Sequence, residues 1–401
     1  MNPAGEPWRI RAEIDHGALR HNAAAMRKAV GDHTGLIAVV KADGYGHGAP
    51  EVAHTLSPFT EQFGVATLDE ARAVRAAVPD KDILILSPCL PDERRTVVDE
   101  GFIPVVSSTA EARAYAQLAE SASVRIHLSI DTGMGRIGVW QDDAVKTVHD
   151  IAAIGGLDLE SISTHLPVAD SDPDFTAEEL AAWDRLVAQL RRMVPGTKFH
   201  ALNSAASLSA PRPAADRIRP GLALYGVSPL PGFKKLLRPV LTLKTRITRV
   251  RDVGPARGIS YGRDFITTKP MRIATLAAGY ADGYPRQTSN QGAQVLIRGK
   301  RCPILGRVTM DQFMVDVTDL PRDVAAGEEV VLFGKQGDEE ITVGEIATWA
   351  GTISWDILTR LGKRVVVQHR DFWPKVEASP LFEQIPCFLT PPRDRPRGRA
   401  G

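Results

Sequence analysis

One lysine of this 401-residue chain stands where it can do covalent chemistry. Lys41 directly follows the apolar run LIAVV and precedes ADGYGHG, so it lies at the end of a predicted buried strand. An amine in such a place can form a Schiff base with a carbonyl compound, and the glycines after it let the backbone approach a ligand closely. A lysine that leaves a strand is more often a solvated charge, so the surrounding sequence must decide between the two interpretations.

Residues later in the same half are suited to binding anions. Ser204 in ALNSAAS and Gly221 in RPGLALYG stand at expected strand-to-helix turns, where hydroxyl and backbone N–H groups are good phosphate donors. Arg136, in IDTGMGRIG, carries a guanidinium whose paired donors match a carboxylate. The ordinary alternatives are a helix cap for Ser204 and a surface salt bridge for Arg136.

The elements that must position these residues follow a regular rhythm between residues 12 and 236. Short apolar runs alternate with segments of helical period: GLIAVVKA with GAPEVAHTL, FGVATLD with EARAVRAAV, and DILILSP with PDERRTVVDEG. Seven or eight such units predict an α/β fold, a parallel (β/α)8 barrel. The carboxyl ends of its strands would meet at one mouth, which is where barrel enzymes place their active sites.

The pattern changes near Arg238. Strand-like runs such as VLTLKTRITRVRDV, MRIATLAAG, AQVLIRG and EEVVLFG are separated by glycine and proline. We predict a second, mostly β domain formed by residues 1–11 together with 237–380, in which TVGEIATWAGTISWDILTRLG has helical period. Residues 381–401 are rich in proline and arginine and predict a disordered tail.

Composition argues against several classes of partner. The 49 basic and 48 acidic residues leave a formal charge of +1, which attracts neither nucleic acid nor an anionic membrane and favours a small-molecule partner. Cys89, Cys302 and Cys387 are far apart and form no metal or disulfide pattern. Since the sequence also has no signal peptide and no run of about 20 apolar residues, we expect a cytoplasmic protein.

The longer motifs together resemble those of the alanine racemases. VVKADGYGHG is similar to the cofactor-lysine motif, and SYGRDF, GYADGYPR and GRVTMDQ follow in the family's order, so the resemblance covers residues 8 to 370. It implies pyridoxal 5′-phosphate as cofactor, on a barrel of fold type III, with no metal. Lys41 would hold the cofactor covalently. Its phosphate would be bound by Tyr45, Ser204, Gly221 and Leu222.

The same resemblance implies roles for Arg219 and His165. Arg219 would face the pyridine nitrogen of the cofactor, and His165 would link Arg219 towards the second acid/base group. An arginine stays charged at any working pH, so unlike a carboxylate it cannot stabilise a protonated ring nitrogen. The cofactor would then be a poorer electron sink, which favours returning a proton to Cα over transamination.

Racemisation takes a proton from one face of a planar carbon and delivers another to the opposite face, which two opposed acid/base groups do most directly. By resemblance, Lys41 serves the D-isomer and Tyr261 of ISYGRDF serves the L-isomer. A tyrosine hydroxyl ordinarily has a pKa of about 10, so this role needs nearby cations or donors. In the family this tyrosine crosses from the second subunit of a head-to-tail dimer together with Met310. The Met310 backbone N–H and Arg136 would receive the substrate carboxylate.

Three positions depart from the family pattern. Ser129 stands where many relatives carry a carbamylated lysine, so an anion, a water or another side chain would replace the carbamate, or Arg136 would be held less firmly. Trp355 replaces a phosphate-binding tyrosine with a larger indole that can still donate. Thr309 stands where cysteine is common. Since these positions surround the substrate entrance, specificity for the substrate side chain is the open point.

We therefore predict a homodimer that interconverts L- and D-alanine by a two-base mechanism and supplies D-alanine for peptidoglycan synthesis. A broader racemase, for example one acting on serine, is an alternative that relative turnover of the two amino acids would separate. A decarboxylase of the same plan would release carbon dioxide, but its Cys-centred motif is absent from the sequence. A pyridoxal-phosphate binding protein without turnover would resemble the barrel half alone, and SYGRDF and GRVTMDQ argue against it.

Overall fold

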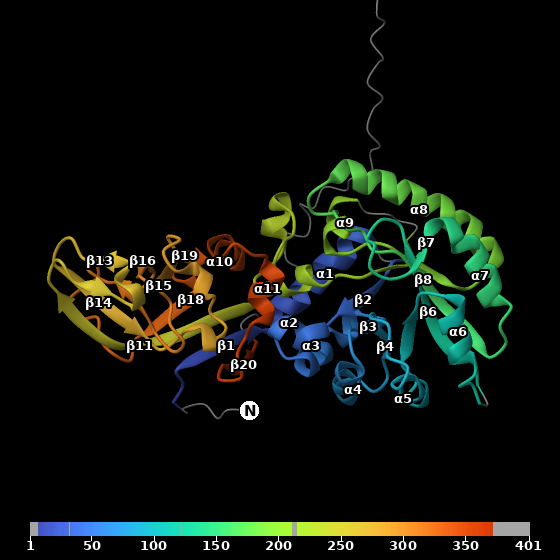
Figure 1. The fold of residues 1–401 in the computed structure, drawn as a ribbon, viewed down its shortest axis with the longest axis horizontal. Coiled ribbons are helices and arrows are strands. Elements are labelled where there is room, and N and C mark those ends of the chain that lie inside the picture. The colour runs from blue at the N-terminus through green and yellow to red at the C-terminus, as the bar shows by residue number, and fades with distance from the viewer. Residues whose placement is uncertain (1–6, 32, 121, 211–214, 372–401) are drawn as a thin grey trace, which may run out of the picture.

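The computed structural model describes residues 7–31, 33–120, 122–210 and 215–371. Within these residues a barrel covered by helices lies beside a mostly β unit (Figure 1). The predicted tail at 381–401, Cys387, and residues 1–6 and 372–380 of the predicted β domain lie outside the described part of the chain.

Parallel strands form the barrel, in the order β10-β2-β3-β4-β5-β6-β8-β9, with β7 (Val139–Trp140) beside β6. Between β9 and β10, Arg219 N–H donates to the Leu202 carbonyl at 2.8 Å and nearly closes the ring. The predicted barrel is thereby confirmed. Its strands are β2 (Gly35–Val39), β3 (Gln62–Val65), β4 (Asp82–Ile85), β5 (Ile103–Val106), β6 (Val124–Asp131), β8 (Leu157–Ser163), β9 (Lys198–His200) and β10 (Arg217–Ile218).

Helices cover the outside of these strands, as Figure 1 shows. Polar residues cap several of them: the Thr67 and Ser108 side chains and the Asp172 carboxylate each accept a backbone N–H from the first helical turn. The helices are α1 (His16–Val30), α3 (Ala49–Leu56), α4 (Leu68–Ala77), α5 (Arg94–Asp99), α6 (Thr109–Ala116), α7 (Ala144–Ala152), α8 (Pro173–Met193) and α9 (Ser204–Ser209).

The β unit is one mixed sheet in the order β19-β18-β15-β16-β17-β14-β11-β1-β20, and because β18 also pairs with β11, part of it closes on itself. The short hairpin of β12 (Gly258–Ile259) and β13 (Phe265–Ile266) stands apart from this sheet. The sheet strands are β1 (Ile10–Asp15), β11 (Leu241–Val253), β14 (Met271–Leu276), β15 (Gln294–Ile297), β16 (Lys300–Leu305), β17 (Phe313–Asp316), β18 (Glu329–Gln336), β19 (Glu339–Ile341) and β20 (Val366–Arg370).

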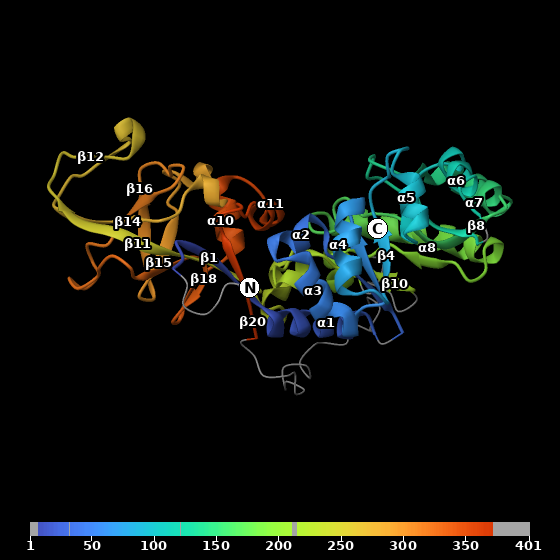
Figure 2. The same cartoon turned by 90° about the horizontal axis from the view of Figure 1, so that it is seen from below.

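The junction between the two units is formed by both ends of the described chain. Strand β1 pairs with β11 and β20, and the next residue begins the first barrel helix. The predicted helical segment near the C-terminus is present as α10 (Val343–Ala350) and α11 (Ser354–Thr359), and α11 lies against the turn that follows β2. One buried apolar cluster runs through both units. Figure 2 shows β12 at the end of the β unit that faces away from the barrel.

Candidate active site

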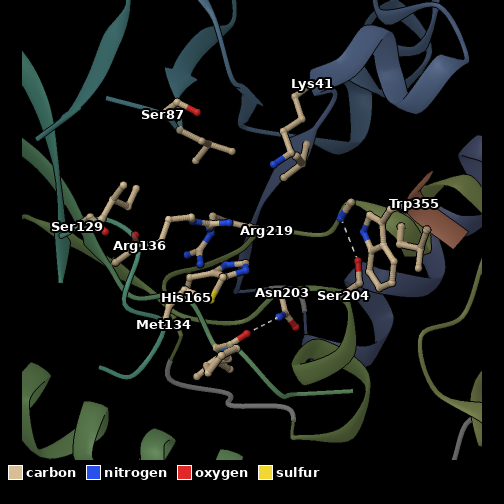
Figure 3. A pocket seen from close by; sticks show the side chains of 18 of the residues that line it. Lys41, Ser87, Ser129, Met134, Arg136, His165, Asn203, Ser204, Arg219 and Trp355 are labelled. Carbon is tan, nitrogen blue, oxygen red and sulfur yellow. Dashed lines mark hydrogen bonds between the residues drawn. The ribbon is translucent and has the colours of Figure 1, made fainter. Parts of the chain in front are cut away.

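A cavity of about 740 Å³ opens at the carboxyl ends of the barrel strands. Figure 3 shows its polar side chains converging from several strands. Every site residue predicted in the barrel half, and Trp355 from the β half, lines it. These residues are Lys41, Tyr45, Arg136, His165, Ser204, Arg219, Gly221, Leu222 and Trp355.

Lys41 begins a turn of left-handed helix directly after β2, within the segment labelled α2 (Lys41–Gly46). The φ angles of Ala42, Asp43 and Tyr45 are 50°, 52° and 54°, a conformation that costs about 1–3 kcal/mol for each residue with a side chain. Hydrogen bonds hold the turn, among them Ala42 N–H to Glu70 Oε1 at 2.7 Å. The protein therefore maintains a strained backbone at the point where Lys41 enters the cavity.

The Lys41 amine is set up to lose its proton more easily than an ordinary lysine. Burial and the nearby Arg136 cation lower the pKa of Lys41, and the Glu70 carboxylate partly opposes them. Since a neutral amine is the form that attacks a carbonyl or accepts a proton, the cavity favours the reactive form.

Donors gather at one end of the cavity around Ser204 and Gly221. The Ser204 hydroxyl oxygen accepts the backbone N–H of Gly221 at 3.0 Å and of Ala223 at 3.2 Å. A Cβ added to Gly221 would lie 2.5 Å from the Tyr45 hydroxyl oxygen, so only glycine leaves room for that phenol. Burial raises the pKa of Tyr45 to about 12 and keeps its hydroxyl a donor. This cluster suits a phosphate group.

Arg219 lies at the end of β10 and is buried. Its Nη1 donates to His200 Nδ1 at 2.5 Å and to the His200 carbonyl at 2.9 Å, and its Nη2 donates to the Thr164 carbonyl at 2.5 Å. Burial lowers the pKa of Arg219 to about 10, which leaves it a fixed cation at neutral pH. Because His200 Nδ1 accepts, the imidazole proton lies on Nε2.

His165 stands beside Arg219 in the cavity (Figure 3), but the hydrogen bonds of the guanidinium within the described chain run to His200, Thr164 and Ala201. Partial burial and three nearby cations lower the pKa of His165; these are Arg219, Arg136 and Lys41. A neutral imidazole in this place can accept or donate. Its expected link to a second acid/base group stays a prediction.

The loop that carries Arg136 is organised by one aspartate at the end of β6. Asp131 Oδ1 accepts the N–H groups of Gly133 and Met134 at 2.9 and 2.8 Å, and Oδ2 accepts that of Arg136 at 3.1 Å. Burial raises the pKa of Asp131, but these backbone donors outweigh it and the net shift is downward. Ser129, on the same strand, is a buried part of the cavity wall.

Trp355 reaches the cavity from α11 in the β unit. Figure 3 shows its indole beside Ser204, at the end where the phosphate donors gather. Trp355 is partly buried and packs against the main apolar core. The indole is therefore held where its N–H is available to an anion and where its bulk narrows the cavity.

Tyr261 and Met310 are not among the residues that line this cavity. Tyr261 lies in a short helix between β12 and β13 and is 73% exposed, and Met310 is 51% exposed. Figure 1 shows β13, and Figure 2 its partner β12, at the end of the β unit that faces away from the barrel. Within one chain the structure therefore does not bring Tyr261 to Lys41.

Sequence reasoning missed His200 and Asp131 as supports of this site. Asp131 had a local signal, because an aspartate that follows a strand and precedes glycine is typical of a loop whose backbone it caps. His200 had none, since its pairing with Arg219 depends on two strands that meet only when the barrel closes.

No group of three or more His, Cys, Asp or Glu residues in the described ranges is arranged to hold a metal ion. Over those same ranges, no helix combines the length and apolar character that a membrane span needs.

A lysine, two arginines and a phosphate-type donor cluster at the mouth of a barrel with an appended β unit define a class of barrel enzymes that hold an anionic cofactor. Comparison with known proteins identifies the family. Residues 14–229 match the model described as alanine racemase, N-terminal domain, and residues 240–369 match alanine racemase, C-terminal domain. The chain belongs to the alanine racemase family.

Individual relatives agree with this assignment over nearly their whole length. The alanine racemase of Methylacidiphilum infernorum (isolate V4) is 38% identical over 374 residues, covering 92% of this chain and 95% of the relative. The Bartonella henselae alanine racemase with covalently bound pyridoxal phosphate aligns with a TM-score of 0.83 at 29% identity, covering 91% and 100%. The Bacillus anthracis alanine racemase with bound L-Ala-P aligns with a TM-score of 0.82 at 31% identity, covering 93% and 98%.

Proposed function

We propose that this chain interconverts L- and D-alanine with pyridoxal phosphate, in a homodimer whose two active sites are each completed by the partner subunit. The observation that carries the proposal is the separation of the two acid/base groups. Lys41 opens into the barrel cavity, whereas Tyr261 is 73% exposed on the other unit of the same chain. A head-to-tail pairing would bring the exposed end of one β unit over the barrel mouth of its partner.

The cavity fits pyridoxal phosphate at both of its ends. The space that Gly221 leaves beside the Tyr45 hydroxyl, with Ser204 close by, is suited to the phosphate group. Lys41 is the amine that would hold the aldehyde carbon, and Arg219 is the cation that would face the ring nitrogen. When bound, the cofactor draws electrons from the substrate and so makes the proton on Cα acidic.

Side chains of the protein then remove the Cα proton and return a proton to the same carbon. Lys41, whose pKa is lowered by burial and Arg136, takes or returns the Cα proton on the face it occupies. Tyr261 of the partner subunit would do so on the opposite face. Arg136 and the Met310 backbone N–H of the partner subunit would hold the carboxylate, so that Cα stays between the two groups.

Exposed apolar side chains support the pairing of subunits. Large apolar side chains remain exposed both on the barrel half of the chain and on the β half, where a partner subunit would cover them. On the barrel half these are Leu90, Trp140 and Phe175; on the β half they are Tyr261, Ile266, Tyr280, Met310, Ile353 and Val367.

We further expect the reaction to take place in the cytoplasm and its product to enter peptidoglycan synthesis. Cys89 and Cys302 are free thiols, as suits a reducing compartment. No observation on the cavity favours serine over alanine, so L-serine belongs in the test as a competing substrate.

The experiment that tests this function follows Cα exchange in deuterated water. The protein loaded with cofactor should convert L-alanine to D-alanine. With either isomer as the starting substrate, it should also incorporate deuterium from the water at Cα. A Tyr261→Phe variant should lose racemisation by about 10²- to 10⁴-fold and stop exchanging L-alanine, while Lys41 still exchanges D-alanine. Tyr284→Phe, a buried tyrosine of the same unit, serves as the control. Racemisation at the normal rate by Tyr261→Phe, or faster turnover of serine than of alanine, would contradict the proposal.

A further inference from the structure

Helix α8 places one buried carboxyl group, that of Glu179, against the loop that carries Arg136. Glu179 is 5% exposed, whereas Glu178 before it is exposed. The Glu179 Oε1 atom accepts the Thr132 hydroxyl at 2.5 Å, and Oε2 is buried with no hydrogen-bond partner among the described residues. Burying a carboxyl group with one oxygen unpaired costs free energy, so we expect Glu179 to have a role in the structure around it.

Two hydrogen bonds lead from Glu179 to the Thr164 side chain, and the backbone of Thr164 in turn binds the Arg219 cation of the cavity. The Thr132 and Thr164 hydroxyl oxygens lie 2.6 Å apart, and the Thr164 carbonyl accepts Arg219 Nη2. Since a carboxylate only accepts, Thr132 donates to Glu179 and Thr164 donates to Thr132. Glu179 thereby sets the direction of both hydroxyl hydrogen bonds that join helix α8 to the side chain of Thr164.

The same carboxyl group supports the loop that carries Arg136. Thr132 lies between Asp131, which caps the loop, and Gly133, where an added Cβ would be 3.6 Å from Glu179 Oε1. Burial raises the pKa of Glu179, the Thr132 hydroxyl lowers it, and the Asp131 carboxylate raises it again, with a net shift upward. The carboxyl group of Glu179 is therefore kept away from water and in contact with the loop.

We infer that Glu179 is a positioning residue. Through Thr132 it fixes the distance between the loop that carries Arg136 and Thr164, the residue whose carbonyl binds Arg219. Neither Glu179 nor Thr132 is among the residues that line the cavity. The inference rests on the proposed function in one respect, namely that Arg136 binds the substrate carboxylate. Loosening the loop should therefore weaken substrate binding more than it slows proton transfer.

The test compares variants of the protein loaded with cofactor. Glu179→Ala should raise the KM for alanine about tenfold in both directions, while kcat changes less than about twofold. Glu179→Gln keeps an acceptor for Thr132 and should return KM to within about threefold of the original value. The control, Glu178→Ala, changes the exposed neighbour on the same helix turn and should leave both constants unchanged.

A second variant guards against a folding defect in Glu179→Ala. Thr132→Val keeps the shape of the side chain but removes both hydroxyl bonds, so it should reproduce the rise in KM. The double variant should be no worse than either single one, because the two residues act through the same bond. Additive losses in KM would overturn the inference, as would a lower melting temperature with unchanged KM.

Hydrogen exchange separates this inference from the proposed function. The backbone amides of residues 133–136 should exchange about tenfold faster in Glu179→Ala and Thr132→Val than in the original protein or Glu178→Ala. Should the original protein fail to racemise alanine while these amides still exchange faster, the proposed function is wrong and the positioning role stands. Should it racemise alanine while both variants keep normal exchange and KM, the positioning role is wrong.

Discussion

Replacing Gly221 by alanine adds one methyl group at the phosphate end of the cavity and nothing elsewhere. The new Cβ would lie 2.5 Å from the Tyr45 hydroxyl oxygen, and carbon and oxygen atoms in contact normally stay about 3.3 Å apart. The phenol must therefore retreat by about 0.8 Å. Tyr45 is 6% exposed and its ring stacks on that of Tyr225 at 4.7 Å, so it has little room to turn aside.

The size of the effect follows from the hydrogen bond that is lost. A bond of about 2.7 Å from the phenol to a phosphate oxygen, lengthened by about 0.8 Å, is no longer a hydrogen bond. A hydrogen bond to a charged group contributes about 1.5–3 kcal/mol, which corresponds to roughly 10- to 150-fold in affinity. Gly221→Ala should weaken pyridoxal-phosphate binding by that factor, with kcat within about threefold once the cofactor is saturating.

The assay titrates the protein stripped of cofactor with pyridoxal phosphate and follows cofactor absorbance at equilibrium. Gly232→Ala is the matched control, because a Cβ added there meets no atom within 4 Å. Melting temperatures measured without cofactor exclude a general loss of structure. Cofactor affinity within twofold of the original in Gly221→Ala would refute the assignment of this cluster as the phosphate site.

Burial lowers the pKa of His47 to about 4, so the folded protein keeps this imidazole neutral while the unfolded chain takes up a proton below about 6.5. The free energy of unfolding should therefore fall by about 3 kcal/mol on account of His47 as pH falls from about 6.5 to 4. In urea unfolding measured across that range, His47→Gln should lose less stability than the original protein. Asp131→Ala removes the acceptor of three loop amides and should raise the KM for alanine about tenfold or more. Asp142→Ala, a change on the surface, should leave KM unchanged. Equal KM values for the two variants would contradict the role of the loop. Trp355→Phe removes an N–H but keeps an aromatic ring and should weaken cofactor binding roughly 5-fold in the same titration, with unchanged affinity showing that the indole only fills space.

Much of the barrel site followed from sequence because the ends of parallel strands meet at one edge. The apolar run before Lys41 predicts a buried strand, and Leu36, Ile37 and Ala38 of that strand are fully buried. Once the alternating pattern predicts a barrel, residues just beyond its strands, such as Lys41 and Arg219, must converge. The motifs then predicted which of them share the cavity, and the structure brings those of the barrel half together there.

The rest depended on packing that the sequence does not display. Glu178 and Glu179 are identical in type and adjacent, and only the way α8 lies on the barrel buries one and exposes the other. The left-handed turn after Lys41 includes Ala42, a residue with no preference for that conformation, so it is imposed by its surroundings. The pairing of His200 with Arg219 required the closed barrel.

The claim that one site is built from two chains is tested most directly by mixing two inactive variants. Lys41→Ala lacks the barrel amine and Tyr261→Phe lacks the opposing phenol, so each dimer alone should be nearly inactive. After unfolding and refolding together in equal amounts, half of the dimers would be mixed, and each mixed dimer would hold one intact site. Alanine racemisation should then recover to about a quarter of the original rate. Activity that stays at the level of the separate variants, with mixed dimers present, would contradict a site shared between subunits.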